Sequence, residues 1–230
     1  DGESFTTAMD SLSYAALVKT YSHDAQVSDS APTASAIMAG VKARNDVIGV
    51  GPEALVSNCT QLKDKTIPSI FEFAQGSGRA TGIISTARIT HATPASTYAH
   101  TPQRDWEADS DMPVAAKAEG CLDIARQLIE NPVGAKMDVI FGGGRSAFLP
   151  SSLADPEYTD QKGRRTDGRD LLSEWSRSNP GGSFVWNAAD FAALDLKSNA
   201  RVLGLFDVEH NSMPRGAGVT GPADLKEKKK

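Results

Sequence analysis

An aspartate and a serine stand directly before a run of small residues near the start of this 230-residue chain. The pair is Asp29 and Ser30, and residues 31–40, which follow, are predicted to form a helix. A helix N-terminus presents free backbone N–H groups and the positive end of the helix dipole, which favour a bound phosphate and a serine alkoxide. Both residue types are also favoured N-caps. The motif therefore indicates either a nucleophile beside an anion site or a structural cap.

The elements that must position this pair alternate between strand and helix. Short apolar runs bounded by glycine or polar residues predict buried parallel strands. We expect strands at 15–21, 79–85, 137–141, 183–187 and 201–206, and helices at 31–40, 66–77, 114–130, 168–178 and 188–194. The second helix would begin at Thr66, with Pro68 in its first turn. This alternation predicts an α/β fold with a central, mostly parallel sheet, and functional residues at the carboxyl ends of its strands.

A second group of reactive residue types lies further along the chain. His91, Thr93, Arg104 and Trp106 fall within a single polar segment that follows the strand predicted at 79–85. The planar guanidinium of Arg104 suits two phosphoryl oxygens. Taken alone, Arg104 is equally typical of a surface loop, and His91 of a hydrogen-bonded loop histidine. Trp106 would lie either at the rim of a site or in the core.

Composition excludes some classes of partner. The chain carries 24 Lys and Arg against 29 Asp and Glu, a net charge of −5, so it lacks the basic face that nucleic-acid binding needs. The only basic run, residues 226–230, closes a stretch, 211–230, that we expect to be a flexible tail. No apolar run approaches the roughly 20 residues of a membrane span. The polar start, without methionine, predicts a processed or truncated chain that carries no signal peptide.

Several spaced motifs, taken in order, resemble the alkaline phosphatase family. They are Asp29-Ser30, residues 88–106, residues 109–113 and residues 138–145, with family-like segments at 155–158 and 204–207. The resemblance covers residues 14 to about 207. It implies a three-layer α/β/α sandwich and one domain, 1–230, truncated at both ends. It also implies metal-dependent hydrolysis of phosphate monoesters to inorganic phosphate, in a homodimer.

The resemblance also implies roles for individual residues. Ser30 would be the nucleophile, forming a phosphoserine intermediate, and a zinc ligand. Asp29 would orient Arg104, which would hold the phosphoryl oxygens. Thr93 would ligate magnesium, and His91 would act on that magnesium through bound water. Zinc and magnesium are thus the implied cofactors, with most zinc ligands expected outside this chain.

A calcium site and a disulfide are implied in the same way. Glu157, the backbone carbonyl of Phe206, and Asp207 resemble the oxygen ligands of a calcium-type site, although the family usually has glutamate where Asp207 stands. Asp224 is a candidate fourth ligand.

From the count alone, Cys59 and Cys121 are two unrelated buried thiols; the resemblance pairs them. Such a bond implies a periplasmic or extracellular location.

Two other functions remain open. The four histidines, His23, His91, His100 and His210, lack the spacing of zinc ligands, so the chain could be a non-catalytic phosphate- or metal-binding fragment of the same fold. A serine hydrolase with His91 as base is the third possibility, but no Gly-x-Ser-x-Gly motif surrounds Ser30.

Overall fold

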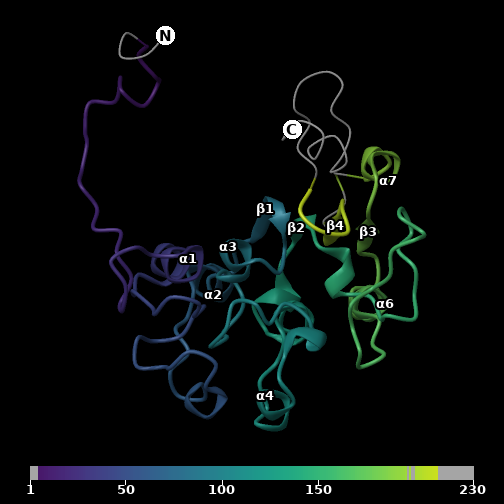
Figure 1. The fold of residues 1–230 in the computed structure, drawn as a ribbon. Coiled ribbons are helices and arrows are strands. Elements are labelled where there is room, and N and C mark those ends of the chain that lie inside the picture. Colours follow the sequence, from purple (N-terminus) through teal and green to yellow (C-terminus); the bar gives the residue numbers. More distant parts are fainter. Residues whose placement is uncertain (1–4, 196, 198–199, 212–230) are drawn as a thin grey trace, which may run out of the picture.

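Four parallel strands form the sheet of the molecule, which the computed structural model describes at residues 5–195, 197 and 200–211. In spatial order they are β1 (Gly82–Arg88), β2 (Val139–Gly143), β4 (Val202–Leu205) and β3 (Ser183–Val185). Figure 1 shows the sheet with α1, α2 and α3 on the side of β1, and α6 on the side of β3. The predicted α/β class with a parallel sheet is confirmed.

The helices are short and lie between or beside these strands. They are α1 (Ser30–Ala39), α2 (Ile70–Gly76), α3 (Ala92–Ala95), α4 (Val114–Ala118), α5 (Ile124–Glu130), α6 (Leu171–Ser178) and α7 (Ala188–Ala192). The main core is formed by side chains of β2 and β4 with those of α5 and α6, among them Ile140, Leu203, Leu128 and Trp175. Since parallel strands of this kind are covered by helices, their apolar runs were readable from the sequence.

The strand predicted at 15–21 is wrong. This segment pairs with no strand among the described residues, and Leu17 and Val18 are exposed. The chain ahead of α1 runs away from the sheet (Figure 1). Its carbonyls at Lys19 and Tyr21 instead accept hydrogen bonds from Lys42 Nζ, at 2.9 and 2.6 Å. An apolar run becomes a strand only where a neighbour takes up its backbone hydrogen bonds.

The helix predicted at 114–130 is two helices, α4 and α5. The chain turns between them at Gly120, whose φ of 89° lies in the left-handed region that glycine adopts readily. Asp123 then starts α5 as its N-cap, accepting from the backbone of Arg126 at 2.9 Å. An apolar pattern that continues across a turn hides the break from a reading based on periodicity.

The helix predicted at 66–77 begins later, at Ile70, after Ser69. Thr66 instead forms an isolated β-bridge with Val50, and the amide of Ile67 donates to the carbonyl of Gly49 at 2.9 Å. Pro68 therefore precedes the helix rather than occupying its first turn, because it keeps the residue before it out of the helical region.

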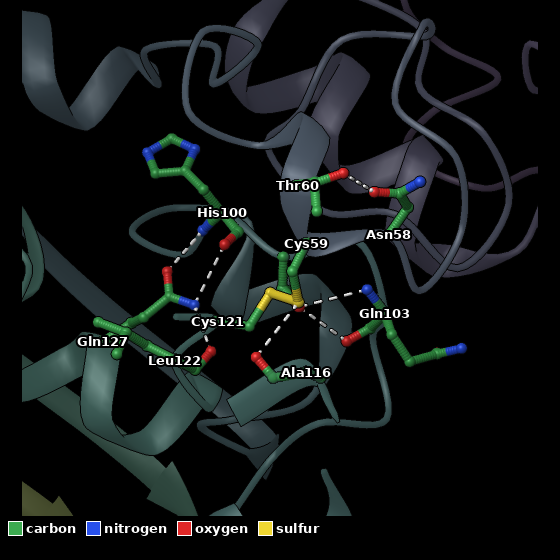
Figure 2. Close-up of a disulfide and its surroundings, with 10 residues drawn as sticks. Asn58, Cys59, Thr60, His100, Gln103, Ala116, Cys121, Leu122 and Gln127 are labelled. Carbon is green, nitrogen blue, oxygen red and sulfur yellow. Dashed lines mark hydrogen bonds between the residues drawn. A yellow bond between two sulfur atoms is a disulfide. The ribbon is translucent and has the colours of Figure 1, made fainter. Parts of the chain in front are cut away.

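The two cysteines are bonded to each other. Cys59 and Cys121 lie 62 residues apart and form a disulfide with a Cα–Cα distance of 5.7 Å (Figure 2). Both are buried in a small cluster with Trp106, Met112 and Ala116. Trp106 is thus a core aromatic and not part of a site rim. Across the described residues, no helix has the length and apolar character that a membrane span requires.

Two sequence expectations fall outside this description. The flexible tail expected at 211–230 lies, apart from Asn211, beyond the described residues, as does Asp224.

Candidate active site

Asp29 begins the site as the N-cap of α1. Its Oδ1 accepts from the backbone N–H of Ala31 at 2.5 Å, and its Oδ2 accepts from the N–H of Asp46 at 2.7 Å. The helix ends at Gly40, whose φ of 72° allows a left-handed C-cap. The predicted capping role is therefore confirmed, and Asp29 additionally fastens the loop that contains Asp46.

Arg104 lies across the N-terminus of α1. One of its terminal nitrogens, Nη1, donates to Ser30 Oγ at 2.8 Å and to Asp29 Oδ1 at 3.1 Å. The other, Nη2, contacts His91 Nε2 at 3.0 Å. The side chain of Arg104 is only 17% exposed, and its backbone N–H donates to the carbonyl of Asp46 at 2.7 Å. Arg104 is thus fixed at both its backbone and its guanidinium.

His91 serves as the hydrogen-bond acceptor in this cluster. An arginine has only donors, so Nε2 must accept and the ring proton resides on Nδ1. Burial, together with the positive charge of Arg104, lowers the pKa of His91, which favours this neutral form. Because Nε2 is taken by Arg104, His91 does not stand as a base against Ser30.

Thr93 lies two residues beyond His91, inside α3. Its side chain is exposed, and the helix begins with His91 as its N-cap residue. The prediction that His91 and Thr93 follow a strand is correct, since β1 ends at Arg88. Ser30 follows no strand among the described residues, which corrects the placement expected for it. The structure brings Asp29, Ser30, Arg104 and His91 together. Thr93 is two residues from His91 in sequence and has no contact with this cluster among those the structure describes.

A buried carboxylate behind these residues was not identified from the sequence. Glu107 is 7% exposed and accepts from Arg88 Nε at 2.9 Å, from Arg88 Nη2 at 2.7 Å and from Thr90 Oγ1 at 2.5 Å. Burial alone would raise the pKa of Glu107, but the hydrogen bonds from Arg88 and Thr90 outweigh it and lower that pKa. The only signal in the sequence was an acidic residue three positions after Arg104.

Segment 209–210 also approaches this region. His210 packs edge-on against His91 with ring centroids 5.1 Å apart, and its Nδ1 accepts from the backbone N–H of Arg88 at 2.9 Å. Glu209 Oε2 accepts from Arg88 Nη1 at 3.3 Å. No local pattern links these residues to β1, since more than a hundred positions separate them.

Two of the three residues expected at the calcium site, Glu157 and Asp207, contact Arg145. Glu157 Oε2 accepts from Arg145 Nη2 at 2.8 Å, and the backbone carbonyl of Asp207 accepts from the N–H of Arg145 at 3.1 Å. Burial, with the carboxylates of Asp207 and Glu157, raises the pKa of Tyr158. The single guanidinium of Arg145 is shared, since it donates once to Glu157 and twice to the buried carboxylate of Asp155.

The described residues do not by themselves complete a metal site. No group of three or more His, Cys, Asp or Glu side chains within residues 5–195, 197 and 200–211 is arranged to hold a metal ion. Ser30 Oγ, the expected zinc ligand, accepts a hydrogen bond from the guanidinium of Arg104. Zinc takes about four protein or water ligands. These residues alone therefore do not fit zinc.

Comparison with known proteins identifies the family. The fold is an α/β domain with a serine and an arginine meeting at the N-terminus of a helix beside a parallel sheet. The family model for alkaline phosphatase matches residues 1–216, so the chain belongs to the alkaline phosphatase family.

Curated relatives agree with this family. The chain is 41% identical over 212 residues to the tissue-nonspecific alkaline phosphatase of Gallus gallus, covering 90% of this chain and 40% of that protein. It is 42% identical over 211 residues to the alkaline phosphatase of Gadus morhua, covering 90% of this chain and 44% of that protein. The chain thus spans less than half the length of these relatives.

Solved structures agree as well. The alkaline phosphatase of the Antarctic bacterium TAB5 matches with a TM-score of 0.60 and 27% identity, over 91% of this chain and 49% of that one. The Thermus thermophilus enzyme matches with a TM-score of 0.57 and 28% identity, over 84% of this chain and 31% of that one. In a TAB5 variant with a histidine replaced by glutamate, magnesium is bound in a site named M3.

Proposed function

We propose that this chain carries the nucleophile and the phosphate-binding arginine of a metal-dependent phosphomonoesterase. The observation that supports this most directly is the position of Arg104 Nη1, which donates to both Ser30 Oγ and Asp29 Oδ1 at the start of α1. A phosphoryl group beside Ser30 would meet this guanidinium directly. Arginine suits that task because its planar fork matches two phosphoryl oxygens.

In the proposed reaction Ser30 Oγ attacks phosphorus. The bond from phosphorus to the ester oxygen breaks, the alcohol leaves, and a phosphoserine forms. Water then attacks this intermediate, releasing inorganic phosphate and restoring the hydroxyl. Asp29 holds Arg104 in place, and Arg104 stabilises the charge on the phosphoryl oxygens as the attack proceeds.

Arg104 carries more of this task than the helix amides do. In the first turn of α1, the N–H of Ala31 donates to Asp29, and Pro32 has no N–H. The N–H of Thr33 points back to the carbonyl of Asp29 at 3.4 Å. Residues 31–33 therefore offer a phosphate no free N–H group, so the helix contributes its dipole and Arg104 supplies the charged hydrogen bonds.

Metal ions belong to this proposal through the family. Zinc at Ser30, magnesium at Thr93 with His91 acting through water, and calcium at Glu157, Phe206 and Asp207 are the assignments we propose. The magnesium bound in the TAB5 variant supports magnesium as one of these ions. Such ions would stabilise charge on the attacking and leaving oxygens. The described residues complete none of these sites, and the roles of Ser30, Asp29 and Arg104 rest on the contacts of these residues with one another.

The two alternative functions are a non-catalytic phosphate-binding fragment and a serine hydrolase. A non-catalytic phosphate-binding role is favoured by the absence of a three-ligand cluster among the described residues. A serine hydrolase with His91 as base is not favoured, because His91 Nε2 accepts from Arg104. The disulfide favours an oxidising compartment, either periplasm or exterior. A homodimer is proposed on family membership alone.

The phosphoserine decides between these functions. The enzyme as its gene encodes it would be mixed with a ³²P-labelled phosphate monoester, quenched in acid and digested, and the labelled peptide identified. We expect acid-stable label on the peptide that contains Ser30 and none in the Ser30→Ala variant. Turnover without label, or equal labelling of the variant, would exclude Ser30 as the nucleophile.

A further inference from the structure

Glu107 links the two segments that meet at the candidate site. It lies three residues after Arg104 in the same loop, while its carboxylate binds Arg88 and Thr90, at the end of β1 and just before His91. Because Arg104 and His91 touch through a single hydrogen bond of 3.0 Å, their segments need another connection to stay in register. Within the described residues, Glu107 is the side chain that joins them from behind.

The connection reaches His91 through the backbone. The turn from Arg88 to His91 is closed by the N–H of His91, which donates to the carbonyl of Arg88 at 2.9 Å. The hydroxyl of Tyr98, which is also buried, donates to the carbonyl of Ile89 at 3.0 Å and holds the middle of the same turn. A shift of Arg88 or Thr90 would therefore move the backbone that carries His91.

The negative charge of the Glu107 carboxylate balances the positive charge of Arg88. Arg88 and Arg104 are both largely buried cations, with side chains 21% and 17% exposed. The bidentate ion pair with Glu107 neutralises Arg88, so that the positive charge facing the Ser30 side is that of Arg104. A buried charge that loses its partner costs several times more than an exposed one. Glu209, the other partner of Arg88, is 51% exposed and can replace little of this interaction.

We propose that Glu107 is a positioning residue for phosphate binding: its carboxylate ties the Arg104 loop to the turn Arg88–His91 and so keeps the guanidinium of Arg104 aimed at the phosphoryl group beside Ser30. This inference rests on the proposed phosphomonoesterase function. It assigns Glu107 no contact with substrate.

The test measures phosphate binding rather than stability. In the enzyme as its gene encodes it, Glu107→Gln would be compared with wild type by the inhibition constant for inorganic phosphate, by KM and kcat, and by calorimetric titration with phosphate. We expect the inhibition constant to rise about tenfold, the size expected for losing one strong charge-assisted hydrogen bond. Glu209→Gln, which weakens the exposed pair on the same arginine, is the matched control and should change it less than about twofold.

A double-mutant cycle separates positioning from general structural damage. If Glu107 acts through Arg104, Glu107→Gln should have almost no further effect on phosphate binding in an Arg104→Ala background. An unchanged inhibition constant in Glu107→Gln, or the same rise in both backgrounds, would overturn the proposal. Should Glu107→Gln fail to fold, Thr90→Val decides instead, since it removes one donor to Glu107 at nearly constant shape. Weaker phosphate binding would then support the proposal, and unchanged binding would refute it.

Failure of the positioning role can be distinguished from failure of the proposed phosphomonoesterase function. If the wild-type enzyme neither forms phosphoserine nor binds inorganic phosphate, the proposed function itself fails. If wild type does both and the Glu107 variant matches it, only the positioning role fails.

Discussion

Arg104 divides its donors among Ser30, Asp29 and His91, so its removal should affect binding of the anion more than the fold. We predict that Arg104→Ala weakens binding of inorganic phosphate by about 1.5–3 kcal/mol, the range for hydrogen bonds to charged groups. The measurement is the inhibition constant for phosphate in the full enzyme. Arg126→Ala, which removes a surface arginine paired with Glu130 on α5, serves as the control. Equal inhibition constants for wild type and Arg104→Ala would place phosphate elsewhere.

For individual residues of the candidate site, the sequence indicated the residue types but not all of their partners. Asp29, Ser30, His91 and Arg104 could be named because they stand in motifs with recognisable order, and the structure brings them together. Glu107 could not be named, because its value depends on Arg88, which is nineteen positions away and on another element. Sequence spacing carries information about contacts within a helix turn or between paired strands. It carries little about contacts between separate elements, such as that of Glu107 with Arg88.

Among the elements, Arg145 joins the ends of β2 and β4. It follows β2, lies fully buried, donates twice to Asp155 at 2.8 Å and donates to the carbonyl of Leu205 at 2.8 Å. We predict that Arg145→Met lowers the free energy of unfolding by about 3–5 kcal/mol, because Asp155 would remain buried without its cation. Urea unfolding would measure this. Arg126→Met, on an exposed pair, should cost less than about 1 kcal/mol. A loss as small as that control would mean that the buried pair contributes nothing.

The same pair predicts a dependence of stability on pH. Burial tends to raise the pKa of Asp155, but the hydrogen bonds from Arg145 and from the backbone of Glu157 and Tyr158 outweigh it, so the folded-state pKa lies below the ordinary value. A lowered carboxylate pKa stabilises the fold above the unfolded-state pKa and loses that contribution as pH falls through the folded-state value. Unfolding free energies should therefore decline below about pH 4 in wild type, and less steeply in Arg145→Met.

The disulfide connects the loop before α2 to the turn between α4 and α5. We predict that replacing both Cys59 and Cys121 by serine lowers the free energy of unfolding by roughly 4 kcal/mol on the chain-entropy account. Denaturant unfolding of the non-reduced protein gives the comparison, and thiol titration of unfolded, unreduced wild type should find no free thiol. Two free thiols per chain would contradict the bond and, with it, the proposed oxidising compartment.

Element boundaries followed local chemistry less closely than element types did. The apolar runs of β2 and β4 were recognisable because strands covered by helices carry continuous apolar sequence. The break at Gly120 and the late start of α2 were missed because the apolar pattern runs across the local signals, Gly120 and Pro68. The disulfide at Cys121 and the β-bridge of Thr66, which lie at these two boundaries, are tertiary contacts that periodicity does not show. The apolar run at 15–21 failed for the converse reason, since no described strand lies beside it.

For the molecule as a whole, the supply of metal ligands limits what these 230 residues can do. All four histidines lie within the described residues, and His100 Nδ1 is committed to the carbonyl of Gly49 at 2.7 Å. We predict that this chain, purified by itself, shows no meaningful phosphatase activity when zinc and magnesium are added, because Ser30 would keep an ordinary hydroxyl. Metal analysis after desalting and a chromogenic phosphate monoester would test it. Robust zinc-dependent turnover would show that a complete site forms within this chain.

The Cys59–Cys121 bond also restricts the conformations of the unfolded chain. The covalent loop it closes contains His91, Arg104 and Glu107, whereas Asp29 and Ser30 lie outside it. Oxidised chains therefore begin refolding with three of these five residues already confined to one ring, and the entropy of closing that ring has been lost in advance. Reduced chains must close it anew. Newly made protein that is oxidised early should consequently assemble faster than protein that meets an oxidant late, and the redox history of the chain becomes a determinant of its yield.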